Sequence, residues 1–295
     1  MNILGKYKND FVALFDSGFG GISVLNYCLK LMPNENFVFY ADSKNCPYGK
    51  KKKEEIVNIG IDIISKFNLY KPKSLIIACG TMSTSDPKKL RDHFPGLDII
   101  GTYPDFEHLL KPFDIVSESI YNFNSETKVS ITKHRLKVLI LATTATCKSK
   151  YVNDKIKNFR GIIDVYAVPA DVIVKAVEND EVDSFYLRNS LEDILKPYKD
   201  VDYVVLGCTH FPFAKKVIKS IISDKAIFTS GCEVAANNCY SHLLEKKATN
   251  SFSGNNKYNI IFVDANLDDK RKSTFLRLLE VDKDKYNIEF ITDIV

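Results

Sequence analysis

The stretch VVLGCTHFP, residues 204–212, joins an apolar strand to a set of reactive side chains. The apolar run ends in a glycine and continues with a thiol, a hydroxyl and an imidazole, those of Cys208, Thr209 and His210. The stretch LIIACGT at residues 75–81 has the same design and places Cys79 directly after its apolar run. Short runs without polar alternation are typical of parallel strands that are covered on both faces. Both cysteines are therefore expected at the carboxyl ends of parallel strands, where such sheets bind their ligands.

The rest of the chain repeats this alternation of apolar runs and segments of helical period. Strands are expected at residues 11–15, 36–40, 74–78, 98–101, 137–142, 164–167, 203–206, 258–263 and 288–291. The pattern predicts an α/β fold, with two similar domains of mostly parallel sheets flanked by helices and an active site in the cleft between them. We expect a first domain of residues 1–102 plus 213–295 and a second of residues 103–212, with a polar insertion around residues 105–134.

The composition is that of a globular protein: of 295 residues, 45% are hydrophobic and 26% charged, with a formal net charge of +4. The lysine run at residues 50–53 has no interleaved aromatic residues, so no nucleic-acid partner is expected. No membrane-spanning stretch and no secretory signal are visible, which leads us to expect a cytoplasmic protein. The seven cysteines include no C-x-x-C pair, so neither a metal site nor a disulfide framework is expected.

The two strand-end cysteines allow two kinds of chemistry. In the first, Cys208 or Cys79 is a nucleophile with His210 as its general base, an arrangement that uses only one thiol. In the second, the thiols stand on opposite walls of a cleft, where one removes a proton from a carbon and the other returns a proton on the opposite face. The second chemistry is that of a two-base racemase or epimerase. Of the other cysteines, four are expected in the core, and the role of Cys46 in its polar loop stays open.

Asp16 and Ser17 follow the first predicted strand and have two interpretations. They could simply cap the next helix. The glycines after them, Gly18, Gly20 and Gly21, match a dinucleotide fingerprint poorly, because the spacing differs and no later acidic partner follows. A glycine turn that lets backbone amides approach a carboxylate is the better physical interpretation.

Two further clusters follow predicted strands. Pro47, Tyr48 and Gly49 form either a plain turn or a group that holds an anionic ligand through the tyrosine hydroxyl and the glycine amide. Thr143 and Thr146 would, taken alone, be expected only to cap a helix. All of these clusters are predicted to lie at the carboxyl ends of strands, together with the two thiols.

Six segments, in this order, carry a resemblance to a known family. They are FDSGFGGISVL (15–25), YADSKNCPYG (40–49), IIACGTMST (76–84), ILATTATCKSKY (140–151), VVLGCTHFP (204–212) and TSGCEVAA (229–236). In combination they resemble the glutamate racemases, of the cofactor-independent aspartate/glutamate racemase superfamily. The resemblance covers nearly the whole chain except roughly residues 105–134. It implies two α/β domains with one catalytic cysteine each, and neither a metal nor pyridoxal phosphate.

The resemblance also implies roles for single residues. Cys79 and Cys208 match the two catalytic cysteines, Asp16 is similar to the aspartate beside the first thiol, and His210 to the histidine beside the second. The positions that match substrate-binding residues are Asp16, Ser17, Pro47, Tyr48, Gly49, Gly80, Thr81, Thr143, Thr146 and Thr209. The implied reaction interconverts L- and D-glutamate at Cα, supplying D-glutamate for bacterial peptidoglycan. Glutamate is the partner that this implies, and a homodimer stays open.

The chain departs from the family pattern in several places, of which two concern single residues near the site. Gly80 stands where an asparagine amide usually helps to hold the substrate, and Glu178 does not align cleanly with the acidic residue of the helix after the sixth strand. Two alternatives therefore stay open: a racemase or isomerase of the same superfamily acting on another amino acid or acid, and a non-catalytic descendant that binds an amino acid. The presence of both thiols with Asp16 and His210 argues against the second alternative.

Overall fold

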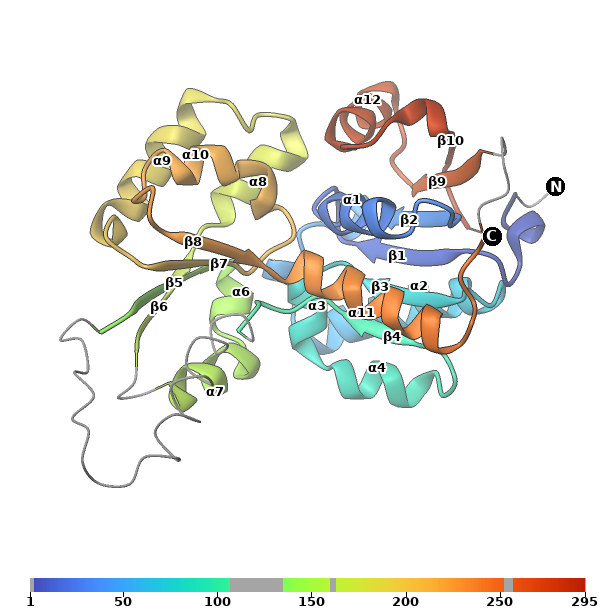
Figure 1. Cartoon of the computed structure of the whole chain (residues 1–295), viewed down its shortest axis with the longest axis horizontal. Coiled ribbons are helices and arrows are strands. Elements are labelled where there is room, and N and C mark those ends of the chain that lie inside the picture. The colour runs from blue at the N-terminus through green and yellow to red at the C-terminus, as the bar shows by residue number, and fades with distance from the viewer. Residues whose placement is uncertain (1–2, 107–134, 160–162, 252–256, 295) are drawn as a thin grey trace.

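Two parallel sheets form the two lobes of the computed structural model, which describes residues 3–106, 135–159, 163–251 and 257–294 (Figure 1). Most of the insertion predicted around residues 105–134 lies outside these ranges. The predicted fold class is confirmed, because all strand pairs in both sheets are parallel and helices flank each sheet.

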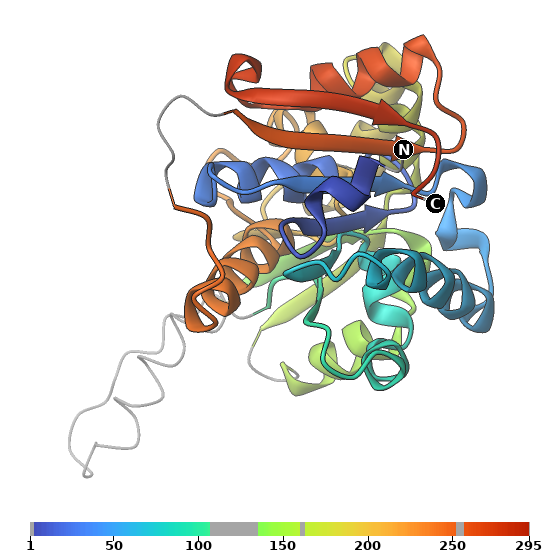
Figure 2. The same ribbon diagram turned by 90° about the vertical axis from the view of Figure 1, so that its right-hand side faces the viewer.

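The larger sheet has the strand order β10-β9-β2-β1-β3-β4. Its strands are β1 (Val12–Asp16), β2 (Phe37–Ala41), β3 (Ser74–Ile77), β4 (Ile99–Gly101), β9 (Tyr258–Asp264) and β10 (Tyr286–Ile291). Every residue of β1, β2 and β3 is buried, because helices cover both faces, and this explains the continuous apolar runs in the sequence. β9 and β10 come from the C-terminal part of the chain: β9 pairs with β2 and β10 with β9, at the upper edge of the sheet in Figure 2.

The smaller sheet has the strand order β6-β5-β7-β8. Its strands are β5 (Lys137–Ala142), β6 (Asp164–Pro169), β7 (Tyr203–Leu206) and β8 (Ile227–Ser230). β8 pairs with β7, although the predicted boundary at residue 212 assigns it to the first domain. The chain returns to the first lobe only after β8, so this boundary falls inside the second lobe. The division into two domains stays a prediction.

Helices cover both faces of each sheet. The first lobe contains α1 (Ile22–Leu31), α2 (Lys53–Asn68), α3 (Gly80–Ser85), α4 (Pro87–His93), α11 (Gly231–Glu245) and α12 (Asp269–Leu278). The second contains α6 (Thr144–Cys147), α7 (Lys150–Asn158), α8 (Asp171–Asn179), α9 (Phe185–Leu195) and α10 (Lys215–Lys219). Short 3-10 helices are η1 (Ile3–Tyr7), η2 (Ser43–Asn45), η3 (Tyr48–Lys50), η4 (Lys196–Tyr198), η5 (Phe211–Ala214) and η6 (Lys283–Lys285). Among the helices in the described ranges, none has the length and apolar character needed to cross a membrane.

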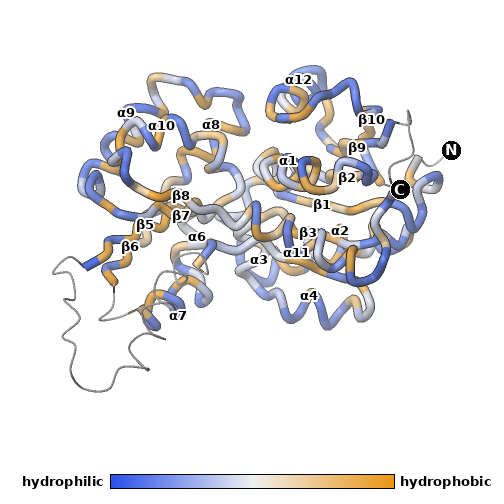
Figure 3. The backbone as a smooth tube through the Cα atoms, viewed as in Figure 1, coloured by the Kyte–Doolittle hydropathy of each residue, from blue (hydrophilic) through white to orange (hydrophobic). Residues whose placement is uncertain are grey.

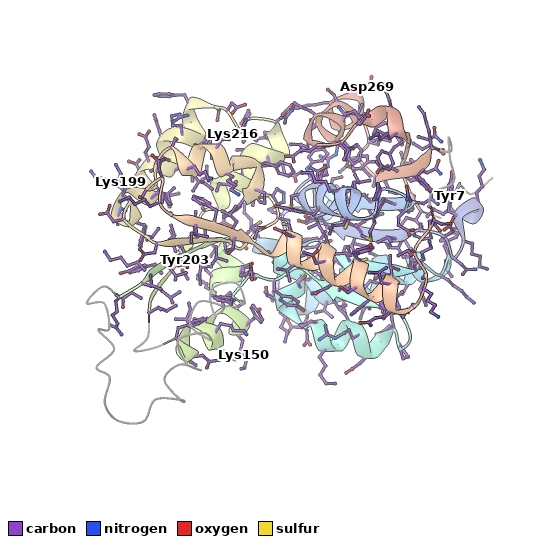
Figure 4. All side chains as sticks on the ribbon, in the orientation of Figure 1. Tyr7, Lys150, Lys199, Tyr203, Lys216 and Asp269 are labelled. Carbon is purple, nitrogen blue, oxygen red and sulfur yellow. The ribbon has the colours of Figure 1, made fainter. Side chains whose placement is uncertain are left out.

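The core is continuous between the lobes on one side of the sheets. One cluster of buried side chains joins α1, α11 and α12 of the first lobe to α8, α9 and α10 of the second. Separate clusters lie beneath α2 and α4 and beneath α7. In Figure 3 the strands are largely orange and the outer helices carry more blue, as expected for sheets enclosed by amphipathic helices. Figure 4 shows side chains filling both lobes, with Tyr7 and Lys199 at opposite ends of the molecule.

Candidate active site

A cavity of about 370 Å³ lies between the carboxyl ends of strands from the two sheets. The first lobe contributes Ser17, Pro47, Tyr48, Gly49, Lys50, Cys79 and Thr81 to its lining. The second lobe contributes Thr143, Thr144, Asp171, Val174, Lys175, Cys208, Thr209 and His210. Ten of the predicted site residues therefore line one cavity, and both strand-end thiols are among them.

Cys79 directly precedes α3, at the end of β3, and its side chain is buried. Its Sγ lies 4.0 Å from the hydroxyl oxygen of Ser17, which follows β1. Burial, reinforced by the carboxyl of Asp16, raises the pKa of the Cys79 thiol well above its usual range. Cys79 is therefore a protonated thiol, placed to give a proton.

Cys208 has a different environment, because its thiol contacts His210, which in turn contacts Glu178. Its Sγ lies 3.7 Å from Nδ1 of His210, and Nε2 of that ring lies 2.8 Å from Oε1 of Glu178. Burial alone would lower the pKa of His210, but the hydrogen bonds to Cys208 and Glu178 raise it well above its usual range. An imidazolium beside a thiol stabilises the thiolate. Cys208 is therefore placed to accept a proton.

Asp16 lies behind the cavity rather than in its lining and is fully buried. Its two carboxyl oxygens accept hydrogen bonds from Ser17 at 3.0 Å and from Thr209 at 2.9 Å. Burial is the main reason that its pKa is raised, although His210 and Thr209 act in the opposite direction. Asp16 thus links Ser17, which lies beside Cys79, to Thr209, which follows Cys208 in the chain.

The glycine turn after Asp16 makes room for the acid–base pair of the other lobe. A Cβ at Gly18 would come within 2.1 Å of a Glu178 carboxylate oxygen, and one at Gly20 within 2.2 Å of His210 Nδ1. Between them, the backbone amide of Phe19 donates a hydrogen bond of 2.6 Å to Glu178. The sequence predicts that this turn lets an amide approach a carboxylate, and the carboxylate that it meets in the structure belongs to the protein itself.

Tyr48 and its neighbours form one wall of the cavity. The Tyr48 hydroxyl donates a hydrogen bond of 2.6 Å to Asp42, and Asn45 also donates to that carboxylate. A phenol has one proton to donate, so the hydroxyl is committed to Asp42 and is not a free donor for an anionic ligand. Pro47 and Gly49 line the same wall.

The predicted threonines form a short hydrogen-bonded chain across the lobes. The hydroxyl oxygens of Thr81 and Thr143 are 3.2 Å apart, and Thr143 donates to Thr146 at 3.0 Å. Thr143 also caps α6 by accepting from the Thr146 amide. Thr146 is fully buried and absent from the cavity lining, so it supports Thr143 from behind.

Gly80 is predicted to bind substrate, but it is not part of the cavity lining. A Cβ at this position would lie 3.1 Å from the carbonyl oxygen of Gly207 and 4.0 Å from the Cα of Cys208. The position is therefore a close approach between the two lobes, directly behind the second thiol. Any side chain there requires the Gly207 carbonyl to move by a few tenths of an ångström.

The prediction omits several residues that the structure brings to the site. Lys50, Thr144, Asp171, Val174 and Lys175 line the cavity, and the carboxylate of Asp171 accepts from the Thr144 amide at 3.1 Å. The omitted residue closest to the chemistry is Glu178. No group of three or more His, Cys, Asp or Glu side chains suited to a metal ion occurs among the described residues.

Because His210 and Glu178 form an ion pair, we expect Glu178→Gln to lower the free energy of unfolding by an amount that depends on pH. Burial opposes ionisation of Glu178, but the His210 bond and charge, the Phe19 amide and Arg271 lower its pKa below the usual 4.5. The pKa of His210 is raised from 6.5. The ion pair therefore stabilises the folded state fully above the ordinary pKa of a glutamate and below that of a histidine, between about pH 4.5 and 6.5. It is lost as pH falls through the lowered pKa of Glu178 and as pH rises through the raised pKa of His210.

We expect Glu178→Gln to lower the free energy of unfolding by about 1.5–3 kcal/mol inside this window. Urea unfolding at about pH 5.5, compared with about pH 3, measures the change, and the difference from wild type should shrink at the lower pH. The exposed Glu181→Gln is the matched control. An equal loss of stability at both pH values would contradict the ion pair.

Comparison with known proteins identifies relatives for this arrangement, although no family model matches the sequence. The glutamate racemase of Clostridium acetobutylicum is 34% identical over 224 residues, which cover 75% of this chain and 79% of that protein. That of Clostridium botulinum strain Alaska E43 is 28% identical over 275 residues, covering 92% of this chain and 98% of that protein.

Solved structures of glutamate racemases share the fold. The Escherichia coli enzyme, in complex with L-glutamate and the activator UDP-MurNAc-ala, matches with a TM-score of 0.74 at 22% identity, covering 97% of this chain and 99% of that one. The Francisella tularensis enzyme in complex with D-glutamate matches with a TM-score of 0.72 at 23% identity, covering 95% and 97%. With the fold shared and the Clostridium acetobutylicum enzyme 34% identical over three quarters of the chain, the chain belongs to the glutamate racemase family.

Proposed function

We propose that this protein interconverts L- and D-glutamate by moving a proton at Cα between two thiols, without a cofactor. The observation that carries the proposal is that Cys79 and Cys208 line one cavity from opposite lobes. A Cα carbon held between them has a sulfur on each face, as a two-base racemisation requires. Lys50 and Lys175, exposed where they line the cavity, carry the positive charge that attracts a substrate with two carboxylates.

Conversion of the L-isomer needs one cysteine that accepts a proton and one that donates a proton. Cys208, beside protonated His210, takes the Cα proton of L-glutamate, so that the C–H bond breaks and an S–H bond forms. Cys79, whose pKa is raised chiefly by burial, gives its proton to the opposite face, so that an S–H bond breaks and a C–H bond forms. D-glutamate leaves with the protonation states of the two thiols exchanged. The reverse reaction starts from that state.

Removal of the Cα proton builds negative charge on the α-carboxylate, so the site needs donors there. The hydroxyl of Thr81 is suited to this role, because the hydrogen bond that it donates to Thr143 across the lobes can be exchanged for a bond to a carboxylate. D-glutamate made in this way would supply peptidoglycan synthesis. All seven cysteines are free thiols, which fits a reducing compartment, so we place the reaction in the cytoplasm.

The test is circular dichroism of the purified protein with L-glutamate and, separately, with D-glutamate, with no added cofactor. The proposal expects the signal of each isomer to decay to zero, because the two enantiomers are equally stable. A protein that leaves both glutamate isomers unchanged but racemises another amino acid would support the other substrate class that Gly80 suggests. A protein that changes no amino acid would exclude racemisation.

Gly80 provides a test of substrate choice. We expect Gly80→Asn to have a KM for glutamate about tenfold lower than that of Gly80→Ala, because the amide can donate to the substrate while both variants carry the same Cβ. The alanine variant measures the cost of pushing against the Gly207 carbonyl at 3.1 Å. Equal KM values in the two variants would show that a side chain here does not reach glutamate.

A further inference from the structure

Arg271, near the start of α12, lies across the junction between the lobes from the second thiol. Figure 1 shows α12 at the edge of the first lobe that faces α8 of the second. Only 16% of the Arg271 side chain is exposed. Its guanidinium carbon lies 4.1 Å from the centre of the Phe19 ring, and its Nε donates to the buried carboxylate of Asp264. Arg271 is therefore fixed by the first lobe.

The fixed guanidinium faces Glu178 of the second lobe. Nη1 of Arg271 lies 3.8 Å from Oε2 of Glu178. The other oxygen, Oε1, accepts from the Phe19 amide at 2.6 Å and from His210 Nε2 at 2.8 Å. The Glu178 carboxylate thus contacts a histidine through one oxygen and an arginine through the other. The Phe19 residue that donates to it also carries the ring on which Arg271 stacks.

The Glu178 side chain is only 16% exposed, and a carboxylate with so little contact with water stays ionised only if charged or hydrogen-bonding partners offset its desolvation. Without Arg271, Oε2 of Glu178 would have no cation beside it, and the carboxylate could rotate away from His210 or take up a proton. Either change removes the anion that stabilises the imidazolium beside Cys208. The effect would be specific to the second thiol, because Cys79 contacts Ser17 and has no link to Glu178 among the hydrogen bonds of the described residues.

We propose that Arg271 is a positioning residue, which holds the Glu178 carboxylate against His210 and so keeps Cys208 ready to accept a proton. Arg271 is not part of the cavity lining, so it acts through Glu178 and not on substrate. Only the effect of Arg271 on turnover rests on the proposed function. The chain of contacts from Arg271 to Cys208 can be tested without any substrate.

The first experiment measures alkylation of Cys208 and Cys79 by iodoacetamide in the same sample, each followed by mass spectrometry. In Arg271→Met the ratio of the Cys208 rate to the Cys79 rate should fall at least about tenfold, because the thiolate loses its support. Arg271→Lys should restore part of the ratio by returning a charge. Loss of the fold would speed both reactions together and is therefore distinguishable.

The matched control is Arg277→Met on the same helix. Arg277 also pairs across the lobes, with Asp180 at the end of α8, and among the ion pairs of the described residues it has none with Glu178. Its alkylation ratio should equal that of the wild type. The proposal is overturned if the ratio in Arg271→Met is unchanged or higher, or if Arg277→Met lowers it equally.

Turnover gives a second readout through glutamate deuterated at Cα. Raising only the barrier at Cys208 should increase the deuterium isotope effect on kcat/KM for L-glutamate and decrease it for D-glutamate. A loss of folded enzyme would change neither, and parallel changes in both would contradict the proposal. If wild-type protein does not turn over glutamate, the proposed function fails, while the alkylation ratios still decide the role of Arg271.

Discussion

Cys79→Ser and Cys208→Ser are each expected to lower racemisation by roughly 100- to 10,000-fold in both directions, the range that one positioned acid or base contributes. Serine is nearly isosteric with cysteine, but its hydroxyl is far less acidic and does not serve as a base at neutral pH. Each direction uses both thiols, one as base and one as acid. Removing either thiol therefore slows both directions.

Cys232→Ser is the control for this pair. Cys232 is buried, lies outside the cavity lining and contacts the Ser23 hydroxyl at 3.2 Å, so a serine finds a polar partner there. Its activity should stay near that of the wild type. Near-normal turnover in either Cys79→Ser or Cys208→Ser would exclude a two-thiol mechanism and favour a single nucleophile with His210 as base.

Gly20→Ala should lower kcat by at least about 100-fold, because a displacement of about 1 Å in a catalytic group costs that much. The added Cβ would lie 2.2 Å from His210 Nδ1 and 2.7 Å from the Thr209 hydroxyl oxygen. Neither neighbour can simply turn aside, because His210 is bound to Glu178 and Thr209 to Asp16. The imidazole must therefore leave its place beside Cys208.

Gly5→Ala controls for the general effect of adding a methyl group, since nothing lies within 4 Å of a Cβ at that position. Both variants should be compared by kcat for glutamate and by thermal unfolding. A Gly20→Ala protein that keeps wild-type kcat would show that the position of His210 does not matter to the reaction.

The fold could be predicted from the sequence where apolar runs are continuous. The strands expected at residues 11–15, 36–40 and 74–78 lie within one residue of β1, β2 and β3, because burial on both faces leaves a clear signal. The helix α3 was harder to predict, since Gly80–Ser85 contains small and hydroxyl residues with weak helix propensity. It forms because Met82 packs into the core beneath α2.

The site could be predicted only in part, because strand ends are visible in the sequence and packing between lobes is not. Cys79 and Cys208 follow strands and could be found. Glu178 approaches Phe19 from 159 positions away in the chain, and Arg271 approaches Glu178 from α12, near the C-terminal end of the chain. The available signal was indirect: Gly18 and Gly20 have no side chains because Glu178 and His210 occupy that space.

The source of the new Cα proton tests the two-thiol mechanism most directly. Wild-type protein is incubated with L-glutamate in D₂O, and the first few per cent of product is analysed by mass spectrometry. Transfer between two thiols predicts that this early D-glutamate carries deuterium at Cα, delivered by Cys79, while the remaining L-glutamate still carries protium. Early D-glutamate that retains protium, or L-glutamate that gains deuterium as fast as the product forms, would contradict it.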